Sequence, residues 1–185
     1  MPHNRSLAIS QASTPQDIEH VKALFAEYTT SLALDLSFQN YSSEVANLPG
    51  AYAPPSGALF IARSTDPASP PGARNVEEGQ GEVVGCIALR PLPSTPRSNS
   101  SLTAICEIKR LYVRPAGRGL GIGRALVERV LLEARALGYE KVKLDTLPSM
   151  QSAIRLYEGL GFRRAGKYYE SPVQGTVFLE MELGD

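Results

Sequence analysis

The stretch EIKRLYVRPAGRGLGIGR, Glu107–Arg124, places four glycines at alternate positions where a strand pattern gives way to a helix pattern. A β-branched and aromatic run precedes the glycines, and the apolar helical pattern ALVERVLLEARAL follows them. Glycine permits positive φ and close approach of the backbone, and the first N–H groups of a helix lack intrahelical partners at the positive end of its dipole. The stretch therefore predicts a cradle for an anion.

The charge of this stretch supports that interpretation. It holds five basic residues and one acidic residue, whereas the whole chain balances 19 Lys plus Arg against 19 Asp plus Glu. A local basic excess in a neutral chain suits a phosphate-bearing small molecule, and the overall balance argues against a general nucleic-acid or anionic-membrane binder. The alternative is a loop that only reverses the chain with a solvated charged face, but such a loop would not need glycines at the start of a strong helix.

A chain of 185 residues with no run near the roughly 18 apolar residues of a membrane span is expected to form one domain. We expect this domain over residues 7–184, after a disordered tail over residues 1–6. The start, MPHNRSLAIS, has no hydrophobic stretch long enough for a signal peptide, which predicts a cytosolic protein. Cys86 and Cys106 are expected to be buried reduced thiols, and two histidines leave little for a metal site. The sequence leaves a homodimer open.

The apolar pattern predicts strands and helices in alternation. Thr14 is expected to cap the first helix, with Pro15 at its first position and Asp17 in its first turn. Strands are predicted at 7–13, 58–64, 81–92, 103–113 and 141–147, with closing strands within 161–169 and 176–183; helices at 14–34, 41–48, 121–137 and 149–160; and polar loops at 65–80 and 93–101. Strands joined both by loops and by helical crossovers indicate an α+β (mixed α/β) fold with a mixed sheet.

The spacing of the glycines distinguishes between phosphate ligands. A dinucleotide site of the G-x-G-x-x-G type lacks its third glycine here, and the Gly-Lys-Ser/Thr of a P-loop is absent. The pattern Arg-x-x-Gly-x-Gly, formed by Arg118, Gly121 and Gly123 after LYVRP, resembles that of the GNAT superfamily of acyl-CoA-dependent N-acyltransferases. A second stretch, SAIRLYEGLGF at Ser152–Phe162, is similar to the family's A-x-x-L-Y-x-x-x-G-F signature and follows one helix and one strand downstream.

The resemblance covers nearly the whole chain, from Leu7 to Leu183. It implies the GNAT fold, a central twisted mixed sheet of about six to seven strands flanked by about four helices. It also implies an N-acetyltransferase, an acyltransferase that moves the acetyl group of its cosubstrate acetyl-CoA to a primary amine by direct attack in a ternary complex, without a metal. The alternatives are a non-catalytic module that binds or senses acyl-CoA, and a nucleotide-dependent oxidoreductase, which would need the missing glycine.

The same resemblance implies a cosubstrate site. The strand that ends at Leu111, Tyr112 and Val113 is expected to separate from its neighbour at a bulge and to pair with the pantetheine arm, and one of its backbone N–H groups is expected to stabilise the oxyanion. The residues expected around the pyrophosphate are Arg118, Gly119, Leu120, Gly121, Ile122, Gly123 and Arg124. Met150 stands where many relatives carry an asparagine, and Ser149 is the candidate to cap the following helix instead.

The resemblance also implies two catalytic residues. Tyr157 is expected to give a proton to the departing thiolate, although its helical spacing with Ala153, Ile154 and Leu160 equally fits a core stripe. Glu107 is the candidate base for the acceptor amine, directly or through water. The alternative for Glu107 is an ion-paired or sheet-edge glutamate.

The acceptor site is the part that the sequence determines least. Tyr168, Tyr169 and Glu170 precede a Pro-and-Gly turn and suit a small cationic amine, but they equally suit ordinary hairpin packing. Asp145 is either a hydrogen-bonding residue at the end of a strand or a charge in the acceptor site. A polyamine, an amino acid, an antibiotic and a protein N-terminus all remain open as acceptors.

Overall fold

One seven-stranded sheet forms the centre of the protein. The computed structural model describes residues 6–32, 40–65, 81–96 and 102–184, and within them the strands follow the order β1-β2-β3-β4-β5-β7-β6. Their bounds are β1 Ser6–Gln11, β2 Ala58–Thr65, β3 Glu82–Pro96, β4 Leu102–Val113, β5 Lys141–Thr146, β6 Arg163–Arg164 and β7 Val177–Glu182. Among these strands β4 and β5 pair in parallel, and all other neighbours pair antiparallel. The predicted mixed sheet is confirmed.

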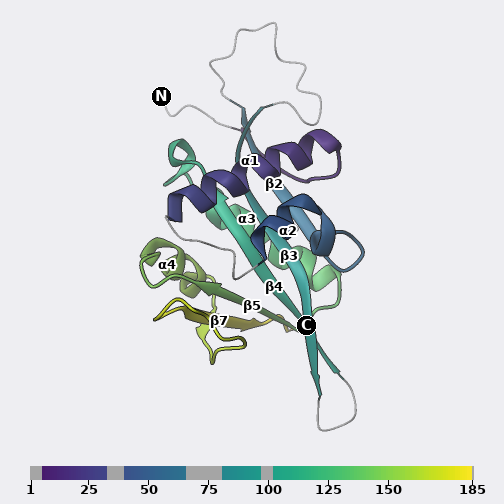
Figure 1. Cartoon of the computed structure of the whole chain (residues 1–185), viewed down its shortest axis with the longest axis vertical. Coiled ribbons are helices and arrows are strands. Elements are labelled where there is room, and N and C mark those ends of the chain that lie inside the picture. Colours follow the sequence, from purple (N-terminus) through teal and green to yellow (C-terminus); the bar gives the residue numbers. More distant parts are fainter. Residues whose placement is uncertain (1–5, 33–39, 66–80, 97–101, 185) are drawn as a thin grey trace, which may run out of the picture.

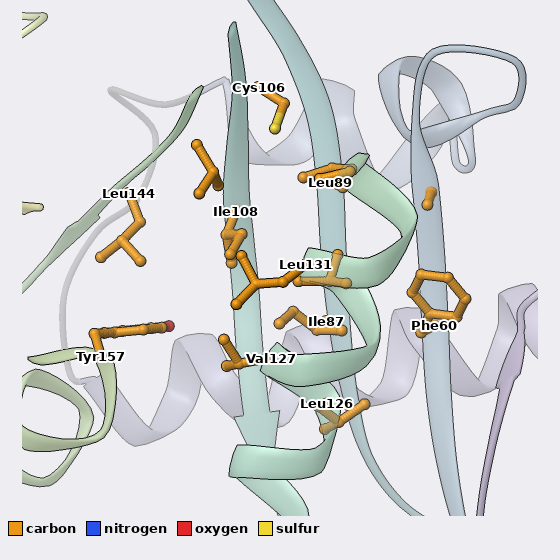
Figure 2. Close-up of a cluster of buried hydrophobic side chains, with 14 of the residues drawn as sticks. Phe60, Ile87, Leu89, Cys106, Ile108, Leu126, Val127, Leu131, Leu144 and Tyr157 are labelled. Carbon is orange, nitrogen blue, oxygen red and sulfur yellow. The ribbon is translucent and has the colours of Figure 1, made fainter. Parts of the chain in front are cut away.

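Helices cover both faces of this sheet. In the described chain they are α1 Pro15–Leu32, α2 Tyr41–Ala46, α3 Ile122–Ala136 and α4 Gln151–Gly159. α1 and α2 lie on one face, and α3 lies on the other (Figure 1). Leu126 and Leu131 of α3 share an apolar cluster with Tyr157 of α4 (Figure 2), while Leu24 and Phe25 of α1 belong to a second cluster on the opposite face. Each face of the sheet therefore has its own apolar core.

The first helix begins where the sequence predicts it. The Thr14 hydroxyl accepts a hydrogen bond from the Asp17 N–H at 3.1 Å, and the Asp17 carboxylate accepts one from the Thr14 N–H at 3.1 Å. This reciprocal pair satisfies N–H groups that have no partner within the helix. Asp17 also pairs with Arg63 of β2 at 2.6 Å. Burial alone would raise the pKa of Asp17, but the hydrogen bonds from Arg63 and from the helix start lower it to about 2.

The β3–β4 hairpin departs most from the prediction. Residues 93–101 are predicted as a loop, but β3 continues to Pro96 and β4 begins at Leu102. These two residues are still paired, and the strands project beyond the helices as a ribbon (Figure 1). Beyond Leu89, β3 no longer pairs with β2. Proline is tolerated on such an edge, because one side of the strand needs no ladder hydrogen bond.

Other expectations are confirmed or lie outside the described chain. Cys86 and Cys106 are buried free thiols, as predicted. The tail at 1–6 and the loop at 65–80 lie outside the described residues, apart from one end residue of each that belongs to β1 and to β2. None of the described helices is both long enough and apolar enough to cross a membrane.

Candidate active site

β4 and β5 separate in the middle of the sheet. Their parallel pairing is confined to Ile105–Glu107 with Lys141–Lys143, although β4 continues to Val113 and β5 to Thr146. Figure 1 shows the two strands diverging. Backbone N–H and C=O groups need partners when they are buried. The separating halves therefore offer pairing groups to an extended ligand.

A bulge in β4 lies beside this opening, as the family resemblance implies. The register with β3 shifts between Lys109 and Tyr112, and Arg110 has a φ of 57°. Left-handed backbone at a non-glycine residue costs roughly 1–2 kcal/mol, so other contacts must stabilise it. Glu44 of α2 accepts two hydrogen bonds from the Arg110 guanidinium, at 2.9 and 2.7 Å, and a third from Tyr52 at 2.8 Å. Burial alone would raise the pKa of Glu44, but Arg110 lowers it below its ordinary value.

The glycine stretch forms the turn from β4 into α3. Gly119 and Gly121 have φ of +76° and +77°, and a Cβ at either position would meet no atom within 4 Å. Gly121 is the N-cap of α3 and provides no side-chain cap, so the first N–H groups of the helix remain available to a ligand. Gly117 differs, because a Cβ there would lie 3.1 Å from side chains of Val113 and Ile122. The stretch thus combines a close-packed glycine with an open helix start.

The side chains around the helix start divide into exposed and buried ones. Arg118 and Arg124 are exposed; Arg118 donates to the Val113 carbonyl at 3.0 Å, and Arg124 pairs with a glutamate of its own helix at 2.8 Å. Leu120 is also exposed, whereas Tyr112 and Ile122 are buried in the core. The two guanidinium groups can reach an anion at the helix start, while Ile122 has only its backbone N–H to offer.

A pocket lies where β4 and β5 separate, and we call it the splay pocket. Its lining comes from α1, β4, β5, the connection at 147–150, α4 and the segment at 165–176 between β6 and β7. Its lining includes three tyrosines, one lysine, one aspartate and one methionine: Tyr28, Tyr157, Tyr169, Lys109, Asp145 and Met150. Asp145 is the only carboxylate among the described residues that line it.

Tyr157 is both a core residue and a wall of the splay pocket. It is 5% exposed and packs edge to face on Phe162, with ring centroids 5.4 Å apart. Figure 2 shows its ring extending toward the strand that carries Ile108. Its hydroxyl makes no hydrogen bond to the described part of the chain. Burial raises the pKa of Tyr157, and the charge of Asp145 adds to the rise, so the phenol stays protonated at neutral pH.

Glu107 is 1% exposed and does not line the splay pocket. Its Oε2 accepts a hydrogen bond from Arg90 Nε at 2.7 Å, and its Oε1 accepts one from the Tyr168 hydroxyl at 2.6 Å. Lys109 Nζ lies 3.7 Å from the same Oε1. This is the ion-paired arrangement that the sequence left open as an alternative. A catalytic role for Glu107 stays a prediction.

The predicted acceptor residues take three different positions. Tyr168 lies over Glu107, as described above. Tyr169 lines the splay pocket, and its hydroxyl is buried with no hydrogen-bond partner among the described residues. Glu170 has a side chain that is 82% exposed and pairs with Lys167 at 2.6 Å. The structure thus brings Tyr169 to the pocket and leaves Glu170 on the surface.

The predicted cap at the start of α4 is wrong. The helix begins at Gln151, its N-cap is Met150, and no side chain forms a cap hydrogen bond. A turn closed by the Met150 N–H and the Leu147 carbonyl at 3.0 Å delays the helix by one residue, which moves Ser149 out of the capping position. The Met150 sulfur accepts a weak hydrogen bond from the Thr146 hydroxyl at 3.6 Å.

Sequence reasoning did not single out two residues of the splay pocket. Tyr28 reads as part of the apolar face of α1, and Lys109 reads only as one of several basic residues. Lys109 donates to Asp145 Oδ1 at 2.8 Å. One signal was present, because Lys109 and Glu107 alternate along β4 and so point to the same face. Asp145, the partner of Lys109, is distant in sequence and could not be paired with it from the sequence alone.

Comparison with known proteins agrees with this geometry. Residues 38–162 match the Acetyltransferase (GNAT) family. An uncharacterized N-acetyltransferase of Schizosaccharomyces pombe is 34% identical over 178 residues, which cover 96% of this chain and 96% of that protein. A GNAT-family acetyltransferase of Staphylococcus aureus has a similar structure, with a TM-score of 0.69 at 18% identity over 96% of this chain and 99% of that one. The structure of a Salmonella typhimurium protein, solved with its cofactor acetyl-CoA, is similar with a TM-score of 0.62 at 19% identity. The match covers 97% of this chain and 95% of that one.

The family match and the Schizosaccharomyces pombe relative place this chain, with its opened mixed sheet and glycine-rich helix start, among the acyl-transferring enzymes. The chain belongs to the acetyltransferase (GNAT) family, and its activity is that of an N-acetyltransferase. The fold expected from the two sequence motifs is confirmed by the sheet order and by the similar structures.

Proposed function

We propose that the protein binds acetyl-CoA and a primary amine together in the opening between β4 and β5, and transfers the acetyl group by direct attack. One observation carries this proposal: three features lie together where β4 leaves β5. They are the backbone of β4 beyond its pairing with β5, the Tyr157 side chain and the uncapped start of α3, where a Cβ at Gly123 would lie within 4 Å of Val113 and Leu156. Each of them suits a different part of the cosubstrate.

The residues present fit acetyl-CoA. The backbone of Leu111–Val113 would pair with the pantetheine arm, because this part of β4 has no partner in β5. The N–H groups at the start of α3 and the guanidinium groups of Arg118 and Arg124 would hold the pyrophosphate. The open space where a Cβ would stand at Gly119 and Gly121 is what such a cradle requires.

Acetyl-CoA supplies an activated thioester, and the chain must handle the protons. As the carbon–sulfur bond breaks, Tyr157 would give a proton to the thiolate, whose basicity is near the cysteine value of about 8.5. A backbone N–H of β4 would stabilise the oxyanion. The amine nitrogen must lose a proton to a base. The candidates are the two carboxylates closest to the opening, Glu107 and Asp145, which are compared below.

A binding series and a turnover screen test this function. Titrations with acetyl-CoA, CoA and NAD are expected to show binding of the first two only. A screen over a panel of primary amines, read by free thiol, is expected to show thiol release that depends on the amine. Acetyl-CoA binding without turnover on any amine would favour the sensing module instead, and NAD binding would favour the oxidoreductase.

A cytosolic location and a homodimer are further proposals from the sequence. Cell fractionation tests the first, and light scattering on the purified protein tests the second. A monomer at micromolar concentration would remove the homodimer.

A further inference from the structure

Asp145 is accessible from the splay pocket in a way that Glu107 is not. The Asp145 side chain is 12% exposed and lines the pocket, whereas that of Glu107 is 1% exposed and does not. Asp145 follows Leu144, which faces the apolar core (Figure 2), so its side chain points to the opposite face of β5. Its Oδ1 accepts a hydrogen bond from Lys109 at 2.8 Å. A ligand in the pocket therefore meets the carboxylate of Asp145 first.

Three tyrosines from separate elements surround Asp145 in the splay pocket: Tyr28 of α1, Tyr157 of α4 and Tyr169 of the segment at 165–176. Burial raises the pKa of all three phenols, and the negative charge of Asp145 adds to each rise; that of Tyr28 reaches about 12. The three tyrosines around Asp145 are therefore uncharged, and Lys109 is the cation that pairs with its carboxylate. The buried Tyr169 hydroxyl makes no hydrogen bond of good geometry to the described residues, but Asp145 and Ser171 lie close enough to affect its pKa, so a ligand bound to Asp145 would also meet this hydroxyl.

The rest of the lining is mixed. Leu32, Leu147, Met150 and Val173 contribute aliphatic and thioether surface, and Thr146, Ser171 and Thr176 contribute hydroxyl groups. Its second cation, Arg110, is neutralised by Glu44. A single accessible carboxylate beside three aromatic rings favours a ligand with one cationic group whose body packs against those rings.

We propose, on the basis of the function proposed above, that Asp145 is the catalytic carboxylate that binds the primary ammonium of the acceptor and takes the proton that its nitrogen loses, and that the acceptor is a cationic amine whose body packs against the tyrosines of the pocket. Glu107 is then a positioning residue. Its contacts orient Tyr168 and, at 3.7 Å, Lys109, so that Lys109 bridges the two carboxylates and holds Asp145 in place.

The proton balance closes around these groups. The bound ammonium loses one proton to solvent, and the neutral amine attacks the thioester carbonyl. Formation of the carbon–nitrogen bond makes the nitrogen positive and more acidic, so it gives a second proton to Asp145. As the carbon–sulfur bond breaks, sulfur takes a proton from Tyr157, which recovers it from Asp145 through water in the pocket. Each turnover yields an amide, a thiol and one released proton.

Binding of matched probes tests the charge. We expect 2-phenylethylamine to bind the wild type at least about 10-fold more tightly than 2-phenylethanol in calorimetry, with and without CoA, and Asp145→Asn to abolish the difference. Glu107→Gln should keep it. Equal or undetectable binding of the two probes by the wild type would overturn the proposal, as would a preference for the amine that survives in Asp145→Asn.

Turnover on an amine that the wild type acetylates tests the catalytic role. Asp145→Asn should lower kcat/KM by about 10²-fold or more and leave acetyl-CoA affinity within about 2-fold, while Asp145→Glu should retain the amine preference and part of the rate. The matched control is Glu182→Gln, which removes an exposed acid of β7 that pairs with Lys141 at 2.8 Å, and it should be unchanged. Full activity of Asp145→Asn would overturn the assignment. A wild type that does not bind acetyl-CoA would instead refute the proposed function. The binding experiment with the two probes would still test the role of Asp145.

Discussion

The two faces of the central sheet are buried by different means, and neighbouring residues of β5 illustrate the difference. Leu144 is 1% exposed and packs in the apolar cluster under α3 (Figure 2). Asp145, the next residue, is partly accessible from the splay pocket, and its charge is paired with Lys109. Apolar burial is non-directional and scales with area, whereas a buried charge needs specific partners. Substitution of Leu144 should therefore change mainly stability, and substitution of Asp145 should change mainly chemistry.

Tyr157 lies where the two faces meet, and the largest effect is expected there. Tyr157→Phe keeps the ring in its apolar seat and removes the proton donor, so turnover should fall about 10²- to 10⁴-fold while acetyl-CoA affinity changes little. Melting temperature and turnover measured on one preparation separate the two roles. A variant that is less stable but fully active would show that Tyr157 belongs to the apolar face alone.

Leu144→Ala tests the apolar face. Removing a fully buried leucine side chain should lower the free energy of unfolding by about 2–5 kcal/mol, because the lost transfer energy and the remaining cavity add. Urea unfolding measures this loss. Activity per folded molecule should stay within about 2-fold, and a strong loss of turnover at unchanged stability would contradict the separation of the two faces.

Asp17 tests, through pH, how much a buried charge pair contributes to stability. Its pKa is about 2 in the folded protein, below the ordinary value of 3.8. Because the pKa of Asp17 is lower in the folded than in the unfolded protein, its ionised carboxylate stabilises the fold at pH values above the unfolded-state pKa. This stabilisation is lost as the pH falls through the folded-state pKa. Here the loss should amount to about 2 kcal/mol between pH 5 and pH 2. Urea unfolding at both pH values should show a smaller loss in Asp17→Asn than in the wild type, and identical losses would contradict the pairing with Arg63.

The smallest expected effect concerns the two ends of α3. Gly121 and Gly138 have φ of +77° and +79°, and a Cβ at either would meet nothing within 4 Å. Replacement of each by alanine should therefore cost a similar amount, about 1 kcal/mol. Only Gly121→Ala should also weaken acetyl-CoA binding, by about 10-fold, since only that end is proposed to hold the pyrophosphate. Equal acetyl-CoA affinities of the two variants in a titration would contradict the proposal that the start of α3 binds the pyrophosphate.

Much of the fold could be predicted from the sequence because its signals are local. Thr14 and Asp17 cap α1 as expected, since the two residues lie three apart and need no tertiary context. The sequence predicts the end of β3 wrongly because Pro93 and Pro96 normally indicate a loop. They fit in a strand here because this part of β3 pairs with β4 on one side and no longer with β2 on the other. Ser149 was misjudged for a similar reason, because a turn beginning at Leu147 shifts the helix start.

The site was harder to predict than the fold because its contacts join distant parts of the chain. Glu107 meets Tyr168, which is 61 residues away, and Lys109 meets Asp145 across 36 residues. Each of these four residues looked ambiguous alone. Which carboxylate became enclosed and which remained accessible depended on the partners that the sheet order brought to each.

The sequence by itself determined the family, the order of strands and helices, and the bare helix start after β4, because these follow from spacing, glycine conformation and apolar periodicity within short stretches. Only the tertiary structure decided how the charges are used. Separation of β4 and β5 opens the splay pocket. Contacts with Arg90 and Tyr168 bury the carboxylate of Glu107, whereas that of Asp145 remains accessible from the pocket. Charge pairing is a property of distance in space, and distances between residues far apart in sequence are set only when the sheet has formed.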